Sequence, residues 1–123
     1  MNKPLYIVWG KVVSGKKRGR ELGFPTANIT LHKAIPEGIY AAKVKVDNKE
    51  FIAATFVGKS ETFQEKESKI EPFLLNFNGD IYGKWISIRL YKKIRNNQVF
   101  SSGVLLTNQM KKDVEDVKNY FLS

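Results

Sequence analysis

The sequence predicts a mainly β protein, a small antiparallel barrel or sandwich, with one helix at its C-terminal end. Short segments rich in β-branched and aromatic residues recur along the chain, and two of them alternate apolar with polar side chains. This alternation is the period of a strand with one buried face. Near the end of the chain the apolar period becomes that of a helix. A length of 123 residues with 42% hydrophobic residues suits one domain with a real core, so we expect residues 1–123 to form a single domain.

The first predicted strands lie on either side of a long irregular region. Leu5–Val13 is rich in β-branched and aromatic residues, and in Tyr40–Val46 apolar residues alternate with lysines. Asp47-Asn48 is a plausible tight turn into the next predicted strand, Phe51–Val57. Ser14–Glu37 contains several glycines and prolines and shows no period. A loop of that length inside a compact domain is usually functional.

The remaining elements follow in order. Ser68–Phe77 is another predicted strand, and Asn78-Gly79-Asp80 after it indicates a hairpin turn. Trp85–Tyr91 alternates again, and we expect Trp85 and Trp9 to be packing residues. One apolar stripe at steps of four, four, three and four predicts a C-terminal helix that packs on the core. Its members are Leu106, Met110, Val114, Val117 and Phe121.

Composition excludes several classes of protein. With no cysteine and one histidine, the chain has no disulfide framework, no Cys or His-cluster metal site and no thiol nucleophile. No apolar run approaches the roughly 18 residues that span a bilayer, and the N-terminus lacks the pattern of a signal peptide, so we expect a cytoplasmic protein. The net charge of +9 requires an anionic partner: nucleic acid, a membrane surface or a phosphorylated small molecule. Basic residues concentrate, without acids, in segments 11–20 and 84–95.

Part of the long loop is suited to phosphate. Gly10–Lys16 reads G-x-x-x-x-G-K, but Lys17 stands where a Walker A loop has Ser or Thr, and the glycines and proline that follow would break the required helix. Glycines and cations can still cradle a polyphosphate. Further on, Thr26 and Asn28 are two residues apart, so in an extended segment both side chains point the same way and offer oxygens to magnesium or phosphate. From spacing alone, a turn in which they bond their own backbone is favoured.

The order of these motifs closely resembles that of the bacterial riboflavin kinase domain, which is usually the C-terminal half of a bifunctional FAD synthetase. The resemblance covers essentially the whole chain, and the Gly-Phe-Pro-Thr-Ala-Asn stretch at residues 23–28 is its most specific part. The matching positions further along are Pro36-x-Gly38-Ile39-Tyr40, Gly58, Thr62-Phe63, Glu71 to Phe77, Tyr82-Gly83, Ile94-Arg95, Phe100, Leu105, Gln109 and Asp113.

The resemblance implies a fold and a reaction. The fold is a closed, six-stranded, Greek-key barrel with a C-terminal helix, and the reaction transfers the γ-phosphoryl group of ATP to the riboflavin 5′-hydroxyl, giving FMN and ADP. Glu71 would be the catalytic carboxylate, although a strand carboxylate seen alone would be read as outward-facing. Thr26 and Asn28 would hold Mg²⁺ and phosphate. The nucleotide-binding set would be Gly15, Arg18, Gly19, Arg20, Thr26, Asn28 and Tyr82, and the flavin-binding set Arg95, Phe100 and Asp113.

The implied partners are riboflavin or FMN and ATP or ADP, with no nucleic acid or membrane. We expect a monomer, with an FMN adenylyltransferase module as a possible companion. The chain departs from the family pattern at Phe56, Glu61, Phe73, Asn76 and Asn97. These departures keep open a flavin-binding domain with weakened catalysis. The net charge keeps open a small nucleic-acid-binding barrel, and the basic segment 84–95, apart from Arg95, has no role in the kinase interpretation.

Overall fold

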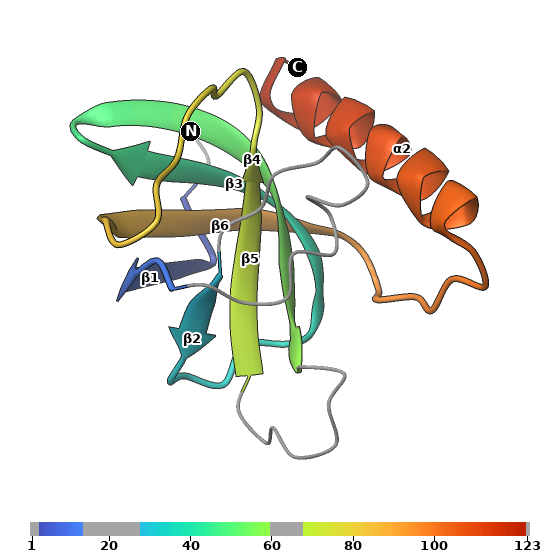
Figure 1. Cartoon of the computed structure of the whole chain (residues 1–123), viewed down its shortest axis with the longest axis horizontal. Helices are drawn as coiled ribbons and strands as arrows, with labels where there is room; N and C mark the ends of the chain where they lie inside the picture. Colours follow the sequence, from blue (N-terminus) through green and yellow to red (C-terminus); the bar gives the residue numbers. More distant parts are fainter. Residues whose placement is uncertain (1–2, 14–27, 60–67, 123) are drawn as a thin grey trace.

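The structure is a computed structural model that describes residues 3–13, 28–59 and 68–122. Within them the chain forms six strands and a long helix (Figure 1). The elements are β1 (Tyr6–Lys11), β2 (Ile29–Leu31), β3 (Gly38–Val46), β4 (Lys49–Lys59), β5 (Ser68–Leu74), β6 (Trp85–Arg95) and α2 (Gly103–Leu122).

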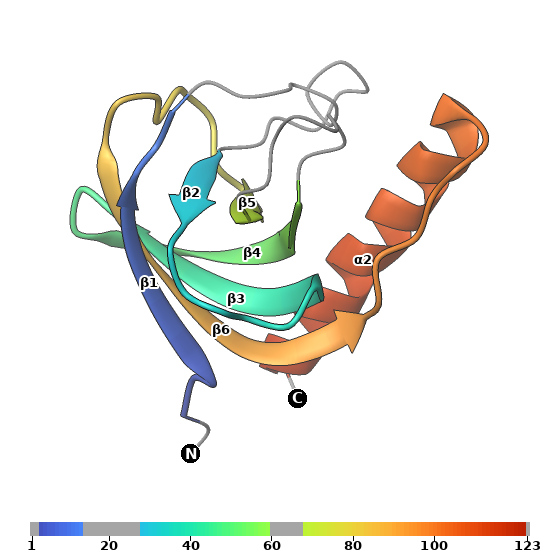
Figure 2. The ribbon, with the colours of Figure 1, turned by 90° about the horizontal axis from the view of Figure 1, so that it is seen from below.

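The strands form one antiparallel sheet in the order β1-β6-β3-β4-β5-β2. Strands β3, β4 and β5 are successive neighbours, and β6 returns to lie beside β3, which is the Greek-key arrangement. The two end strands approach each other (Figure 2), and the Val13 amide donates a hydrogen bond of 2.9 Å to the Asn28 carbonyl. The sheet is therefore a nearly closed six-stranded barrel, which confirms the predicted fold.

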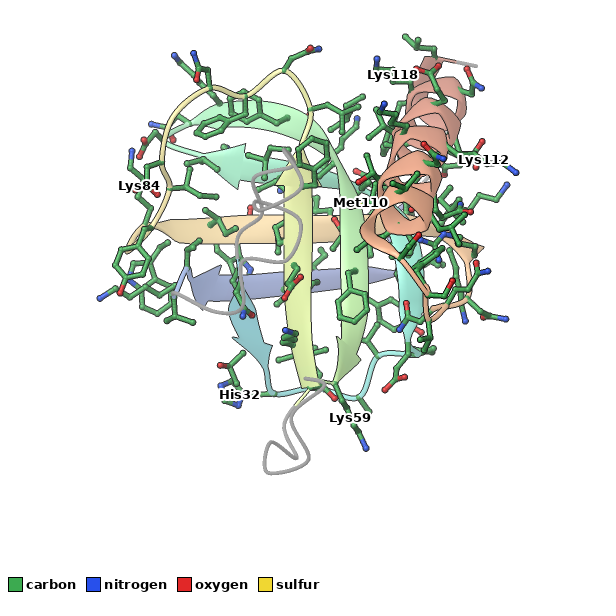
Figure 3. The ribbon with its side chains drawn as sticks, turned by 45° about the vertical axis from the view of Figure 1, so that its right-hand side comes forward. His32, Lys59, Lys84, Met110, Lys112 and Lys118 are labelled. Atoms are coloured by element: carbon green, nitrogen blue, oxygen red, sulfur yellow. The ribbon has the colours of Figure 1, made fainter. Side chains whose placement is uncertain are left out.

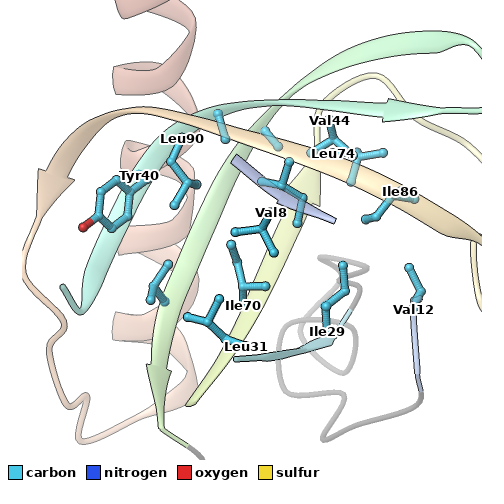
Figure 4. Packing of buried hydrophobic residues seen from close by; sticks show 14 of the residues in the cluster. Val8, Val12, Ile29, Leu31, Tyr40, Val44, Ile70, Leu74, Ile86 and Leu90 are labelled. Carbon is cyan, nitrogen blue, oxygen red and sulfur yellow. The ribbon is translucent and has the colours of Figure 1, made fainter. Parts of the chain in front are cut away.

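The core fills the barrel interior with the inward residues of every strand (Figure 4). Ile86, Ile88 and Leu90 of β6 are at most 1% exposed, as their alternation predicted. Tyr40 is the largest fully buried side chain, and its hydroxyl donates to the Pro36 carbonyl at 2.7 Å. Burying that ring is compatible with stability because its one polar group has a partner.

The turn predicted between β3 and β4 is confirmed. Asp47 and Asn48 have φ angles of 50° and 65°, and Val46 pairs with Lys49 across them. Two consecutive left-handed residues make the type I′ turn that matches the twist of a hairpin, and Asn and Asp tolerate it better than most residues.

Three predictions about local structure are wrong. Ile29–Leu31, inside the region predicted to be irregular, is strand β2; three residues are too few to show a period. Asn78-Gly79-Asp80 is not a hairpin turn, because β5 pairs with β4 and β2 while β6 pairs with β1 and β3. Trp9 and Trp85, expected to pack, are 70% and 69% exposed. They occupy outward positions on β1 and β6, where strand propensity alone places no constraint on burial.

Helix α2 lies over the outer face of the barrel, on the side away from β1 (Figure 2). Ser102 caps its N-terminus, since its hydroxyl accepts a hydrogen bond from the Leu105 amide at 3.2 Å. The predicted apolar stripe faces β3, β4 and β6, with Val117 fully buried. Within the described residues no helix is long and apolar enough to cross a membrane.

The basic segment 84–95 is mostly paired within the domain. Lys84 forms an ion pair with Asp47, and Arg89 lies 3.6 Å from Glu50. Lys92 lies over the Tyr120 ring, 5.8 Å from its centroid. Most charged side chains of this segment therefore contact neighbouring strands or α2 within the domain.

Candidate active site between the barrel and the helix

Strand register places four side chains in one row on the barrel face that α2 covers. Arg95 of β6 is opposite Ile39 of β3, Ile39 is opposite Phe56 of β4, and Phe56 is opposite Glu71 of β5. Residues in register on one face are direct neighbours. The row therefore connects the predicted flavin-binding arginine to the predicted catalytic carboxylate.

Asn28 extends this row beyond Glu71. The pairing of β2 with β5 joins Ile29 to Ile70 and Thr30 to Lys69. Asn28 directly precedes β2, and this register continued by one residue would bring it level with Glu71. Asn28, one of the predicted nucleotide-binding residues, therefore lies at the end of β2 nearer Glu71, across β5 from β4.

A pocket of about 100 Å³ lies above the row, between the strands and α2. Met110 lies on the side of the helix that faces the strands (Figure 3) and contributes to this pocket. Its walls combine apolar and polar side chains, as ligand pockets usually do. The lining residues are Ile39, Ala54, Phe56, Glu71, Phe73, Arg95, Asn97, Gln98, Phe100, Leu106, Met110 and Asp113.

Arg95 and Asp113 form the polar end of the pocket. The Arg95 Nε and Nη2 groups donate to the two Asp113 carboxylate oxygens, each at 2.7 Å. Gln109 donates to Asp113 Oδ1 at 3.0 Å, and the Arg95 guanidinium lies 5.9 Å from the Phe100 ring centroid. A bidentate pair of this kind fixes both side chains. The structure thus brings together all three predicted flavin-binding residues.

Glu71 forms the other polar end. Its side chain is only 12% exposed, and its Oε1 lies 2.7 Å from Lys69 Nζ, whose side chain is 9% exposed. The angles of this contact are not those of a hydrogen bond, and Oε1 accepts none from the described residues. The contact is an ion pair by distance and charge. It leaves a buried carboxylate oxygen able to accept a proton or a hydrogen bond.

Three of the five departures from the family pattern lie in this pocket. Phe56, Phe73 and Asn97 are lining residues, and Asn97 donates to the Val57 carbonyl at 3.0 Å. The Phe56 ring extends over Gly58, where an added Cβ would lie 2.6 Å from the ring edge. Of the other two, Asn76 has a φ of 56° just after β5, and Glu61 lies outside the described residues. Three of the departures therefore contribute side chains to the pocket wall.

Most of the predicted nucleotide-binding residues lie outside the described part of the chain. Gly15, Arg18, Gly19, Arg20 and Thr26 lie outside the described residues, so their roles stay predictions. Tyr82 is 61% exposed and does not line the pocket. Its neighbour Gly83 donates to the Val12 carbonyl at 2.9 Å, which sets Tyr82 beside the end of β1, where that loop begins.

Sequence reasoning missed several residues in or beside the pocket. Leu106 and Met110 were predicted only as core because their helical stripe has the spacing of a packing face. Lys69 was not singled out, although its spacing of two from Glu71 puts both on one strand face. Asn97 was named only as a departure from the family pattern, and Gln98 has no local pattern that would mark it, because the pocket forms between elements far apart in the chain.

Fold and site together define a six-stranded barrel with a pocket between sheet and helix, and a buried carboxylate lines that pocket. The family model described as Flavokinase, riboflavin kinase, matches residues 2–121, and the chain belongs to this family.

Relatives agree with this assignment. The bifunctional riboflavin kinase/FMN adenylyltransferase of Buchnera aphidicola subsp. Schizaphis graminum is 45% identical over 94% of this chain and 39% of its own length. The riboflavin kinase of Trypanosoma brucei has a TM-score of 0.68 at 26% identity, covering 95% of this chain and 77% of that one. A structure described as a macrolide-efflux protein from Streptococcus pneumoniae has a TM-score of 0.84 at 36% identity, over 94% and 39%. The chain thus spans about two fifths of the bifunctional relative.

Proposed function

We propose that this chain transfers the γ-phosphoryl group of ATP to the 5′-hydroxyl of riboflavin, producing FMN and ADP. The observation that carries the proposal is the buried Glu71 carboxylate, with an oxygen that accepts no hydrogen bond from the described residues. It stands in the register row between the pocket and Asn28. Family membership supports the choice of substrate.

The pocket is the proposed flavin end of the site. Its apolar side chains suit an aromatic ring system. Arg95 and Asp113 hold each other bidentately, so the guanidinium edge near Phe100 is already oriented before a ligand arrives. Such preorganisation lowers the entropy lost on binding.

Glu71 is the proposed proton acceptor. Transfer forms a bond between the 5′-oxygen and the γ-phosphorus and breaks the bond from that phosphorus to the ADP oxygen, while the hydroxyl proton passes to Glu71. Phosphoryl transfer depends mainly on positioning and charge stabilisation. A carboxylate fixed beside the attacking hydroxyl would supply positioning. The loop cations Arg18 and Arg20 would supply part of the charge stabilisation.

Thr26 and Asn28 are the proposed protein ligands of Mg²⁺. Hydroxyl and amide oxygens are hard donors of the kind this ion accepts. No group of three or more carboxylate or histidine side chains suited to a metal occurs within the described residues. This fits an ion held largely by ATP phosphates, whose charge it neutralises when bound.

Other aspects of the prediction remain proposals. A monomeric state, a cytoplasmic location and association with an FMN adenylyltransferase module rest on the sequence and on the bifunctional relatives. A flavin-binding domain with weakened catalysis is the second candidate, favoured by the three departures that line the pocket. The internal pairing of segment 84–95 weakens the nucleic-acid alternative.

The direct test is incubation with riboflavin, ATP and Mg²⁺, with FMN and ADP separated by chromatography. We expect both products to appear in equal amounts. Riboflavin that binds but is not converted would establish the second candidate instead. If riboflavin is neither bound nor converted, the proposal is overturned.

The variant Glu71→Gln tests the assigned role. Because the amide cannot accept the hydroxyl proton, we expect turnover to fall by about 10² to 10⁴-fold while riboflavin binding, followed by flavin fluorescence, changes little. Glu115→Gln is the matched control, since that carboxylate is 68% exposed on α2 and outside the pocket. An unchanged rate in Glu71→Gln would remove Glu71 from the mechanism.

A further inference from the structure

Lys69 is a buried cation directly beside the proposed catalytic carboxylate. It precedes Glu71 by two residues on β5, so both side chains leave the same face of the strand. Register puts Lys69 opposite Thr30 of β2 on one side and Gly58 of β4 on the other. It does not line the flavin pocket, whereas Glu71 does.

Burial makes this lysine unusual. The residue is 7% exposed, and lysine is rarely buried unless it is paired. Glu71 is its ion-pair partner, with Nζ and Oε1 2.7 Å apart. The ion pairs of the described residues include no second partner for either group.

We propose that Lys69 is a positioning residue for Glu71, an inference that rests on the proposed kinase reaction. A glutamate side chain has several rotatable bonds, and a neighbouring ammonium restricts where its carboxylate lies. The ammonium holds the carboxylate by charge across 2.7 Å, and Oε1 accepts no hydrogen bond from the described residues.

This role has a kinetic signature. Lys69→Met retains the aliphatic stem but removes the charge. A carboxylate displaced by about 1 Å from its productive position can cost on the order of 100-fold in rate, so we expect kcat to fall about 10- to 100-fold. The KM values for riboflavin and ATP should change much less. Lys69→Arg, which retains the charge, should recover much of the lost kcat.

A double-mutant cycle separates positioning from an independent contribution. If Lys69 acts only through Glu71, adding Lys69→Met to Glu71→Gln should cause no further loss of kcat. A multiplied loss in the double variant would overturn the inference. A raised KM for ATP with unchanged kcat would also overturn it, because it would show that Lys69 binds the nucleotide directly.

Controls keep the inference distinct from the proposed function. Lys45→Met alters an exposed lysine on β3 and should leave all kinetic constants unchanged. Absence of FMN with the unaltered protein would count against the kinase reaction itself. An active protein whose Lys69→Met variant matches Lys45→Met would overturn only the role of Lys69. Should Lys69→Met fail to fold, as judged by circular dichroism, Lys69→Gln and Lys69→Arg replace it. Equal kcat values in those two variants would contradict the proposed role of the Lys69 charge.

Discussion

Arg95 and Asp113 form the contact that ties β6 to α2 at the polar end of the pocket. The Asp113 side chain is 5% exposed and the Arg95 side chain 19%. Removing one partner of a buried pair leaves the other charge without compensation. Gln109 would still donate to Asp113 in the absence of Arg95, which moderates this cost.

For Arg95→Met we therefore expect a loss of about 2 to 4 kcal/mol in the free energy of unfolding, measured with urea. Arg95→Met combined with Asp113→Leu should be less destabilising than the single change. Arg89→Met is the control, because Arg89 and Glu50 are 33% and 49% exposed and such a pair contributes at most about 1 kcal/mol. Equal losses in Arg95→Met and Arg89→Met would contradict the structural role of the buried pair.

Tyr40 makes alkaline stability depend on pH. Burial, reinforced by the nearby Tyr6, raises the pKa of the Tyr40 hydroxyl above its ordinary value of 10.0. The folded protein therefore holds this proton more tightly than the unfolded chain does. The resulting contribution to the free energy of unfolding is complete below about pH 10. It is lost as the pH rises through the raised value.

We expect the free energy of unfolding to fall more steeply above pH 10 in the unaltered protein than in Tyr40→Phe. Near neutral pH the phenylalanine variant should be less stable by about 1 kcal/mol, because the Pro36 carbonyl loses its donor. Urea unfolding of both proteins at a series of pH values measures this. Parallel curves above pH 10 would show that the Tyr40 proton is not linked to folding.

At the scale of elements, the β3–β4 hairpin depends on its two left-handed residues. Both Asp47 and Asn48 have positive φ, which costs a β-branched residue about 1–2 kcal/mol. Asn48→Val should lower the free energy of unfolding by that amount, whereas Asn48→Gly should leave it equal or slightly higher. Thermal unfolding compares the two variants. A valine variant as stable as the glycine one would indicate that the turn adopts another conformation.

Strand β5 carries core residues on its inner face and the proposed catalytic and positioning residues on its outer face. Ile70, Pro72 and Leu74 face inward and are buried, while Lys69, Glu71 and Phe73 occupy the outer face. Pro72, which lacks a backbone donor, lies beyond the three residues that β2 pairs with. Proline is confined to sheet edges and bulges because it lacks that donor, and the short partner strand leaves Pro72 without a neighbour on the β2 side among the described residues.

At the scale of the whole molecule, closure of the barrel depends on a close approach of β1 to β2. A Cβ at Gly10 would overlap the Ile29 side chain, which is 2% exposed. Gly10→Val should therefore push the two end strands apart and cost about 1–3 kcal/mol or more. Lys11→Val, on the outward face of the same strand, is the control.

Thermal unfolding and riboflavin binding of Gly10→Val should both be measured. Because the pocket lies on the far side of the barrel from β1 (Figure 2), we expect stability to fall more than flavin affinity. A Gly10→Val protein as stable as Lys11→Val would mean that the barrel closes without this close approach.

The sequence by itself determined the class of fold, the alternating strands, the β3–β4 turn, the helix with its packing face, and the family. These features rest on local periods and on motif residues, which are visible along the chain. Arg95, Phe100 and Asp113 were named through resemblance, and their mutual contact became evident only when β6 and α2 were in place.

Only the tertiary structure decided which residues meet. Strand β2 was too short to show a period, and its pairing with β5 is what brings the Asn28 end of β2 toward Glu71. The exposure of Trp9 and the burial of Lys69 likewise follow from which elements cover each face of the barrel. Burial and proximity are set by register and by packing between distant segments, and local sequence does not record either.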